Sequence, residues 1–404
     1  MTSSDLSTTR ATSAWETRAP ARPGAATAGP VPRPAAGPAA TPDVVSSVTG
    51  ALPVVVSVTA VVVTRGGSPY LRRTLAAVRA QTSAPDAVVV VDADSGVSGQ
   101  YPDLQLGDAR FLAAPRARSF GEAVDAALAH VEAGTWLWLL HDDSAPAPDA
   151  LAELLRAVEH SSAVAVAGPK QERWEPGPDP EPRDPFEPGT AGRLIEVGVT
   201  TTPLGRRMTG IDDDEIDQGQ HDAREDVLGV GLAGALVRRS VWEELGGTDP
   251  EYGPFGDGLD LCRRARLAGH RVIVVPTAVV RHVQASLLGL RDRQGRRRTE
   301  ARPDVEASYA ARRHAQLHAR LAGVAAPSLL FVGLAMLVGA PFHAMFRLLV
   351  KQPRLARDEI VVPLWTLARV GPVLRARRAA RRLGHGAPGA GERVPAHRAE
   401  RRAR

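Results

Sequence analysis

Adjacent carboxylates end an apolar segment near the middle of the chain. Residues 136–144 read Trp-Leu-Trp-Leu-Leu-His-Asp-Asp-Ser, which predicts a buried strand that leads directly into Asp142 and Asp143. Because ligands of open α/β sheets bind just beyond the carboxyl ends of the strands, we expect a ligand site here. Carboxylate oxygens suit Mg²⁺ or Mn²⁺, which also bind substrate phosphates. The alternative is a helix cap with a solvated neighbour, since a proline-rich turn introduces a helix directly afterwards.

Alternating strands and helices upstream predict a nucleotide-binding half of an α/β fold. A β-branched strand is expected over 55–63, a helix over about 69–80 and a second buried strand over 87–91. Strands that alternate with helices of this length favour right-handed crossovers and a mostly parallel sheet. The second strand leads to Asp92 and Asp94, which could accept hydrogen bonds from a base or ribose. Turn capping by the same side chains is an equally good interpretation.

Neither a dinucleotide-binding fingerprint nor a P-loop follows the early strands, so a nucleotide would have to be held by individual side chains. Transfer of a group away from a nucleoside diphosphate would need two further parts. A metal ion stabilises the negative charge that builds on the leaving diphosphate. A carboxylate within hydrogen-bond reach of the acceptor hydroxyl removes its proton.

Six ordered segments carry a resemblance to a known family. They read Val-Thr-Ala-Val-Val-Val-Thr-Arg (58–65), Val-Val-Val-Asp-Ala-Asp-Ser (89–95), Leu-Leu-His-Asp-Asp-Ser (139–144), Gly-Ala-Leu-Val-Arg-Arg (234–239), Leu-Gly-Gly-Thr-Asp-Pro (245–250) and Phe-Gly-Asp-Gly-Leu-Asp-Leu-Cys-Arg-Arg (255–264). In this order they resemble the family 2 glycosyltransferases, inverting enzymes of the GT-A fold, in a membrane-associated bacterial form. The likeness covers about residues 55–282.

The resemblance implies roles for residues at matching positions. The fold would be α/β, with a mostly parallel central sheet flanked by helices, and the cofactor would be Mg²⁺ or Mn²⁺. The implied metal ligands are Asp143 and His282. The histidine is included because several relatives place a histidine beside the metal. The general base would be Asp257 or Asp260. The residues implied to bind the nucleotide sugar are Thr64, Arg65, Asp92, Asp94 and Asp142.

The chain departs from the family pattern in two places. Where the family has Asp-x-Asp, the chain has a histidine at position 141, which makes Asp143 the favoured ligand. Gly258 stands where the second acid of the later motif is usual, so Asp257 and Asp260 share the candidacy for base. Without the resemblance, Asp257 could equally serve the dipole of a helix expected over 259–268.

Other patterns that suggest chemistry have plainer explanations. The run Gln171-Glu172-Arg173-Trp174 is one residue short of a signature of processive polysaccharide synthases, and we expect a loop. His314 and His318 have helical spacing but no third ligand, which favours a solvated helical face over a zinc site. The acidic run 212–215 lacks the glycine of a calcium loop and is expected to be solvated. Cys262 is expected to pack inside a helix, and a lone cysteine agrees with a reducing compartment.

Composition divides the chain into four parts. Residues 1–50 are rich in Ala, Pro, Thr and Ser and should be disordered, and they show no apolar core of a signal peptide. Residues 51–318 would form the glycosyltransferase domain, 319–383 a helical membrane-associated segment and 384–404 a basic disordered tail. Within the domain, the polar stretch 174–226 is expected to be an acceptor-facing insertion that precedes a strand over 231–237.

Residues 328–345 form an uncharged, mostly apolar run near the minimum length of a membrane span. A second apolar stretch, 360–374, is interrupted by Arg369, and arginines flank both stretches. Basic groups on every side favour a hairpin or interfacial helices on the cytoplasmic face of the cell membrane. The alternative is a soluble helical extension.

The net charge of +5 does not require nucleic acid, because the excess arginines lie in the last hundred residues, where anionic lipid explains them. We therefore expect a membrane-associated enzyme that moves sugar from a nucleotide-diphosphate donor to a lipid-linked or cell-envelope glycan. The alternatives are a nucleotidyltransferase, which normally has a longer glycine-rich loop after its first strand, and a non-catalytic membrane scaffold derived from a GT-A fold.

Overall fold

The computed structural model describes residues 56–386 apart from 67, 95–107, 132–135, 160, 176–183, 187–191, 203 and 292–301. The chain divides into two units, Met1–Val54 and Val55–Arg404, and the description concerns the second. The tail expected over 1–50 lies outside the described residues. Of the tail expected over 384–404, the first residues are the end of a helix and 387–404 lie outside the description.

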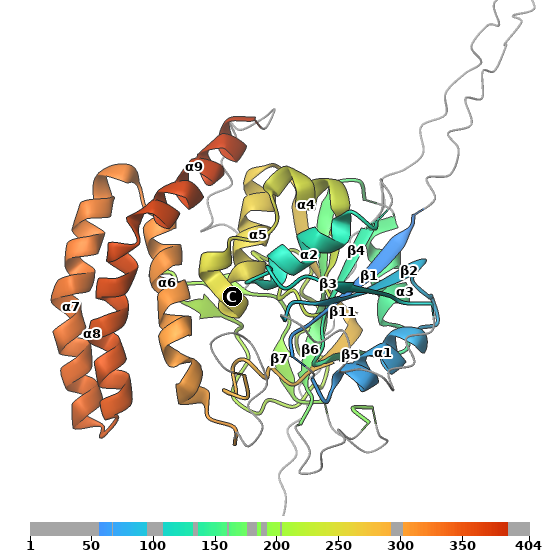
Figure 1. The fold of residues 1–404 in the computed structure, drawn as a ribbon, viewed down its shortest axis with the longest axis horizontal. Coiled ribbons are helices and arrows are strands. Elements are labelled where there is room, and N and C mark those ends of the chain that lie inside the picture. Colours follow the sequence, from blue (N-terminus) through green and yellow to red (C-terminus); the bar gives the residue numbers. More distant parts are fainter. Residues whose placement is uncertain are drawn as a thin grey trace, which may run out of the picture. The chain divides into compact units, whose positions relative to one another are not determined.

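A mixed sheet of nine strands forms the centre of the glycosyltransferase-like region (Figure 1). Its order is β3-β2-β1-β4-β10-β6-β11-β5, with β7 paired to β6. The strands are β1 (Val58–Thr64), β2 (Ala87–Asp92), β3 (Arg110–Ala113), β4 (Trp136–His141), β5 (Ser144–Pro146), β6 (Val164–Arg173), β7 (Leu194–Glu196), β10 (Leu236–Arg238) and β11 (Arg271–His282). Strands β1 to β4 pair in parallel, as do β6 and β11, whereas β10 is antiparallel to both neighbours. The predicted α/β fold with a mostly parallel sheet is confirmed.

Helices cover both faces of this sheet because its central strands are apolar on both sides. Along β4, Leu137 and Leu139 point to one core cluster while Trp138 and Leu140 point to the other. Full burial of one such side chain contributes about 1.5–3 kcal/mol. The first cluster is completed by α2 (Phe120–Leu128), α4 (Arg239–Leu245) and α5 (Asp257–Leu267), and the second by α1 (Leu71–Arg79) and α3 (Ala150–Glu159).

The structure corrects two of the sequence predictions in this region. Residues Gln171 to Arg173 are not a loop but the end of β6, paired with β7 and β11. The strand expected over 231–237 is reduced to β10, because Gly234 has a positive φ of 86° that turns the chain just before it. A small hairpin of β8 (Thr200–Thr201) and β9 (Arg207–Met208) lies within the polar insertion.

The C-terminal helices form a second layer with a small core of its own. They are α6 (Tyr309–Gly323), α7 (Leu329–Leu349), α8 (Pro353–Ala368) and α9 (Val370–Gly386), with single 3-10 turns η2 (Val305–Ser308) and η3 (Ala326–Ser328) before α6 and α7. Leu321, Met336 and Val362 belong to this core. The domain boundary expected at residue 318 falls inside α6.

The packing of α6 departs from the sequence prediction of a solvated histidine face. Both histidines are buried against η1 (Pro250–Phe255), the turn that leads into α5. His318 Nε2 lies 3.0 Å from Asp249 Oδ2, and His314 Nε2 lies 3.4 Å from Glu251 Oε2. The imidazoles therefore tie the helical region to the loop that precedes α5.

The segment Ala326–Leu349 is long and apolar enough to span a membrane by length and composition, with a mean hydropathy of 2.0. Little of it is buried against the rest of the chain, since only 17% of its apolar window is covered. Figure 1 shows α7 on the side of α8 that faces away from the sheet. This helix therefore presents a large apolar surface.

Candidate active site

The carboxyl ends of β1 and β4 place Asp142 against Thr64. The Thr64 hydroxyl donates to Asp142 Oδ2 at 2.8 Å, and Thr74 from α1 donates to the Asp142 carbonyl at 3.0 Å. The Arg291 guanidinium forms an ion pair with the same carboxylate and reaches Asp143 Oδ1 at 3.9 Å. Asp142 is thus held by neighbours on both sides, and its carboxylate oxygens are already engaged.

The next carboxylate lies between imidazoles. Asp143 Oδ1 is 3.3 Å from His282 Nε2, and His282 Nε2 is 3.4 Å from His141 Nδ1. The potential ligand atoms of His141, Asp143 and His282 all lie within 4.8 Å of one another. The second Asp143 oxygen accepts from the backbone N–H of Ala285 at 2.8 Å. The structure therefore brings the predicted ligands Asp143 and His282 together and adds His141 to them.

The protonation states of this cluster suit a cation. Burial, together with the neighbouring His282, lowers the pKa of His141 to about 3, so its imidazole is neutral. Although burial alone would raise the pKa of Asp143, His282 and Arg291 hold it well below its usual range. His141 Nε2 is buried with no hydrogen-bond partner among the described residues. A neutral imidazole and an ionised carboxylate are the forms in which these side chains bind divalent metals.

The residues predicted to hold the nucleotide lie at the ends of the next two strands. Thr64 ends β1, and Asp92 ends β2 and is paired with it in register. Burial raises the pKa of Asp92, while its Oδ1 accepts from the backbone N–H of Asp94 at 2.9 Å. Arg65 extends to the Ala117 carbonyl, to which it donates at 2.6 Å. The carboxyl edge of the parallel strands thus gathers these polar side chains, as expected for a nucleotide site.

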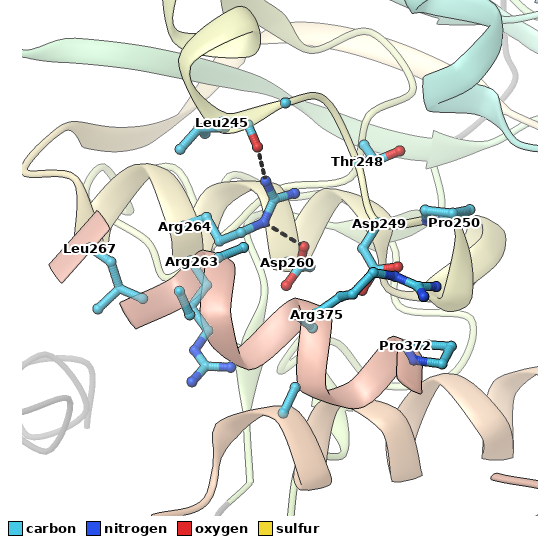
Figure 2. A pocket seen from close by; sticks show the side chains of 15 residues that line it. Leu245, Thr248, Asp249, Pro250, Asp260, Arg263, Arg264, Leu267, Pro372 and Arg375 are labelled. Carbon is cyan, nitrogen blue, oxygen red and sulfur yellow. Dashed lines mark hydrogen bonds and ion pairs between the residues drawn. The ribbon is translucent and has the colours of Figure 1, made fainter. Parts of the chain in front are cut away.

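Asp257 and Asp260 occupy different environments although they are one turn apart on α5. Asp260 accepts from Arg264 Nε at 2.7 Å, and the same guanidinium donates to the carbonyls of Leu245 and Gly247. Asp260 and Arg264 line a cavity of about 230 Å³ between α5 and α9. Figure 2 shows the Asp260 carboxylate turned toward Arg264 in this cavity.

Among the described residues, Asp257 has no such counter-charge at hydrogen-bond distance. Its Oδ1 accepts from the adjacent Gly258 N–H at 2.7 Å, and burial raises its pKa to about 7. A carboxyl group with a pKa near neutrality is suited to exchange a proton.

The segment 230–235 connects Asp257 to the metal-binding candidates. A Cβ at Gly258 would lie 2.5 Å from the Val230 carbonyl oxygen, so α5 begins in direct contact with this segment. At its other end, Gly234 N–H donates to the Leu139 carbonyl of β4 at 2.7 Å. The Ala233 carbonyl accepts from Gln171 on β6 at 3.2 Å. One short segment therefore touches the start of α5, the strand β4 that leads to Asp143 and the strand β6 that supports His282.

Several residues of the site had no clear sequence signal. Arg291 lies outside every recognised motif. Glu196 lies inside the polar insertion, yet its carboxylate is buried and accepts from Gly231 N–H at 2.5 Å. Glu196 also pairs with Arg207, whose charge partly offsets the raised pKa of Asp257. His141 had a signal, because it stands at the first position of the Asp-x-Asp pattern, but was not predicted as a ligand.

Comparison with known proteins identifies the family. The family model described as "Glycosyltransferase like family 2" matches residues 53–301, more than half of the chain. The chain therefore belongs to this family, and its fold is of the GT-A type with a C-terminal helical region. A search of curated proteins found no match.

Solved structures of glycosyltransferases are among the structural neighbours. A crystal structure of GalNAc-T7 with UDP, GalNAc and Mn²⁺ shares 15% identity at a TM-score of 0.44, covering 63% of this chain and 47% of that one. The mannosyltransferase PcManGT from Pyrobaculum calidifontis, in complex with GDP-Man and Mn²⁺, shares 18% identity at a TM-score of 0.38 and covers 86% and 79% of the respective chains. The chain thus spans about half the length of the first neighbour.

Proposed function

We propose that this protein is an inverting glycosyltransferase that moves a sugar from a nucleotide-diphosphate donor to an acceptor hydroxyl. The observation that carries the proposal is the juxtaposition of His141, Asp143 and His282 at the end of β4. Across the segment 230–235 from this cluster lies Asp257, a buried carboxyl group with a pKa of about 7. A cation site and a proton acceptor are the two parts that this transfer needs.

The donor is assigned to the carboxyl edge of β1, β2 and β4. Asp92 and Asp94 would accept hydrogen bonds from the nucleoside, while Thr64 and Arg65 line the path from the nucleoside to the diphosphate. Asp142 holds Thr64 and Arg291 in place through its two oxygens. The Arg291 guanidinium would then supply positive charge to the diphosphate, because guanidinium groups bind phosphates in a bidentate manner.

The residues that would hold the metal are His141, Asp143 and His282. When bound, a divalent cation would neutralise charge on the leaving diphosphate. Two imidazoles and one carboxylate form a softer donor set than the all-oxygen sites that Mg²⁺ prefers. We therefore propose that Mn²⁺ supports activity better than Mg²⁺, and the Mn²⁺ in both solved neighbours agrees with this choice.

Asp257 is the proposed general base. Its carboxylate would accept the proton of the acceptor hydroxyl as that oxygen attacks the anomeric carbon from the face opposite the leaving group. Asp260 is excluded from this role by its ion pair with the buried Arg264. The burial that raises the pKa of Asp257 also makes the carboxylate a stronger proton acceptor.

The acceptor is proposed to be a lipid-linked or cell-envelope glycan, reached at the cytoplasmic face of the cell membrane. Support comes from the exposed apolar surface of α7 and from the arginines that follow it on α8 and α9. Such a surface would bind the interfacial region of a bilayer, and the arginines would contact anionic headgroups.

The decisive experiment is turnover of a panel of nucleotide sugars by the purified full chain with Mn²⁺ and a lipid extract as the source of acceptor. Release of nucleoside diphosphate together with a glycosylated product of inverted configuration supports the proposal. Release of sugar 1-phosphate, with the nucleotidyl group transferred to an acceptor, would indicate a nucleotidyltransferase instead. Absence of turnover with every donor, despite Mn²⁺ binding, would indicate a non-catalytic scaffold.

A further inference from the structure

Gln171 on β6 joins the candidate metal site to the segment that borders Asp257. Its side chain is almost fully buried, at 3% exposure. Its Oε1 lies 3.2 Å from His282 Nδ1, and its Nε2 donates to the Ala233 carbonyl at 3.2 Å. Both ends of the amide are therefore occupied.

The hydrogen-bond partner of one end of the Gln171 amide determines whether the other end donates or accepts. A backbone carbonyl only accepts hydrogen bonds, so the Gln171 –NH₂ group must face Ala233 and the amide oxygen must face His282. An amide oxygen only accepts as well. His282 Nδ1 must then carry a hydrogen, so Nε2 is the ring nitrogen that can offer a lone pair to a cation.

Nε2 is directed into the metal-binding cluster. His282 Nε2 is the atom that lies 3.3 Å from Asp143 Oδ1 and 3.4 Å from His141 Nδ1. Backbone contacts hold His282 in this position. The residue pairs with Arg173 across β6 and β11, and its carbonyl accepts from Trp174 N–H at 3.1 Å.

We propose that Gln171 is a positioning residue that selects the His282 tautomer able to bind a divalent cation through Nε2. The proposal rests on the glycosyltransferase function proposed above and adds a specific requirement to its metal site. Ligand histidines in metal sites commonly donate their other ring N–H to such an acceptor, and loss of the acceptor typically weakens metal binding by about 10–100-fold. The run Gln171-Glu172-Arg173-Trp174 thus acquires a role at the cation site.

A second buried glutamine, Gln81, provides the control for a substitution at Gln171, because it does not contact the proposed metal ligands. Gln81 is also buried, donates to the Ala147 carbonyl at 2.7 Å and accepts from Leu151 N–H at 3.0 Å. Its hydrogen-bond partners Ala77, Ala147 and Leu151 do not belong to the cluster. Gln171→Leu and Gln81→Leu therefore remove comparable buried amides, but only the first removes a partner of His282.

The test measures Mn²⁺ binding to the full chain without donor, by electron paramagnetic resonance of the free ion. We expect Gln171→Leu to weaken Mn²⁺ binding by about 10–100-fold and Gln81→Leu to leave it unchanged. Equal Mn²⁺ affinities for the folded Gln171→Leu protein and the wild type, or equal losses in both variants, would overturn the proposal. If the wild type itself binds no Mn²⁺, the metal site of the proposed function fails.

A second measurement does not depend on whether the glutamine variants fold. The ¹⁵N chemical shifts of labelled histidines in the metal-free wild type report which ring nitrogens carry a hydrogen. Assigned by loss of its signals in His282→Ala, His282 should carry a hydrogen on Nδ1. A His282 Nδ1 without a hydrogen would overturn the role of Gln171 even if the protein transfers sugar.

Discussion

Asp257 and Asp260 illustrate how burial with or without a counter-charge separates two similar side chains. Both are less than 10% exposed on the same helix. Asp260 is paired with Arg264, which in turn holds the carbonyls of Leu245 and Gly247, so its role is structural. Among the residues that the structure describes, Asp257 has no such partner, and the cost of ionising it in a buried position gives it a pKa of about 7. Their chemistry is decided by their neighbours rather than by their residue type.

The first prediction concerns Asp257→Asn. The variant keeps the shape of the side chain but cannot accept a proton, so transfer should fall roughly a hundredfold or more while donor affinity is retained. In the wild type, the rate should rise with pH through about 7 as the carboxylate forms. Steady-state rates of donor turnover between pH 5 and 9 check this. A flat wild-type profile across this range would contradict the assignment of Asp257 as the base.

The same substitution should also change stability in a pH-dependent way. Folding raises the pKa of Asp257 from its ordinary value of 3.8 to about 7. The protonated group therefore favours the folded state below pH 3.8, and this contribution is lost as the pH rises to about 7. Above that pH, the ionised carboxylate opposes folding, so Asp257→Asn should raise the Tm at pH 8 and have little effect at pH 4. Thermal unfolding at the two pH values measures the difference.

Asp260→Asn provides the matched variant one turn further along α5. It leaves the buried Arg264 guanidinium without its counter-charge, which should lower the free energy of unfolding by about 3–5 kcal/mol. Turnover per folded molecule should remain within a few fold of the wild type, because Asp260 lines the cavity between α5 and α9 and its carboxylate is held by Arg264. Loss of turnover at unchanged stability would identify Asp260 as the base instead.

The next prediction concerns His141 and the preference of the site for Mn²⁺ over Mg²⁺. His141→Asp restores the Asp-x-Asp pattern and replaces an imidazole nitrogen by a harder oxygen donor. We expect the variant to bind Mg²⁺ more tightly relative to Mn²⁺, with a change of about tenfold or more in the ratio of the two dissociation constants. Competition between the ions, followed by the resonance of free Mn²⁺, measures this ratio. An unchanged ratio would show that His141 is not a ligand.

At the scale of the elements, the sequence predicted best what depends on local patterns of apolar residues. Strand β4 is apolar on both faces and α1 has its apolar residues at helical spacing, so both were expected within two residues of their observed bounds. Both elements can be predicted without knowing which residues distant in the sequence contact them. The position of Asp142 and Asp143 follows from the end of β4 alone.

Elements whose stability depends on polar partners far away in the sequence could not be predicted in this way. The end of β6 is polar, and it is buried because Glu172 pairs with Arg281 at 3.0 Å and Gln171 contacts His282. His314 and His318 are buried on α6 because carboxylates of the η1 segment meet them. In both cases the partner is more than 60 residues away, so the local pattern indicated a loop for residues 171–174 and a solvated helical face for the two histidines.

Gly258 provides a prediction at the junction of two elements. Since a Cβ at this position would lie 2.5 Å from the Val230 carbonyl oxygen, Gly258→Ala must shift the start of α5 or the segment 230–235. The substitution should cost about 1–3 kcal/mol of stability and lower turnover by moving Asp257, with Mn²⁺ affinity unchanged. Gly371→Ala on α9 is the control, because its Cβ would meet no atom closer than 3.9 Å. Equal effects of the two substitutions on turnover would show that contact with Val230 does not position the base.

At the scale of the molecule, the C-terminal helices are attached to the glycosyltransferase region through the turn before Asp257. Glu251 of η1 contacts His314 and forms an ion pair with Arg369, and His318 contacts Asp249. Removing α6 would therefore expose the half-buried carboxylates of Asp249 and Glu251 in the segment that precedes the proposed base. Association with a membrane is better tested by substitutions on the exposed face of α7 than by truncation.

The last prediction concerns that face. Phe331, Phe342 and Phe346 on α7 are 60–72% exposed, which is unusual for phenylalanine unless the side chain meets another apolar phase. The full chain should sediment with vesicles that contain anionic phospholipid, because the apolar face enters the interface and arginines on α8 and α9 contact the headgroups. Replacing the three phenylalanines by glutamine should abolish sedimentation at high salt, where electrostatic attraction is screened.

Leu204→Gln is the control for this experiment, since Leu204 is 57% exposed but lies in the polar insertion. That variant should sediment like the wild type at every salt concentration. Because the substituted phenylalanines make few contacts within the chain, the triple variant should keep its fold and its Mn²⁺ affinity, and only its partition onto vesicles should change. If the wild type stays in the supernatant at low salt without detergent, α7 does not bind membranes and is a helical extension that faces water.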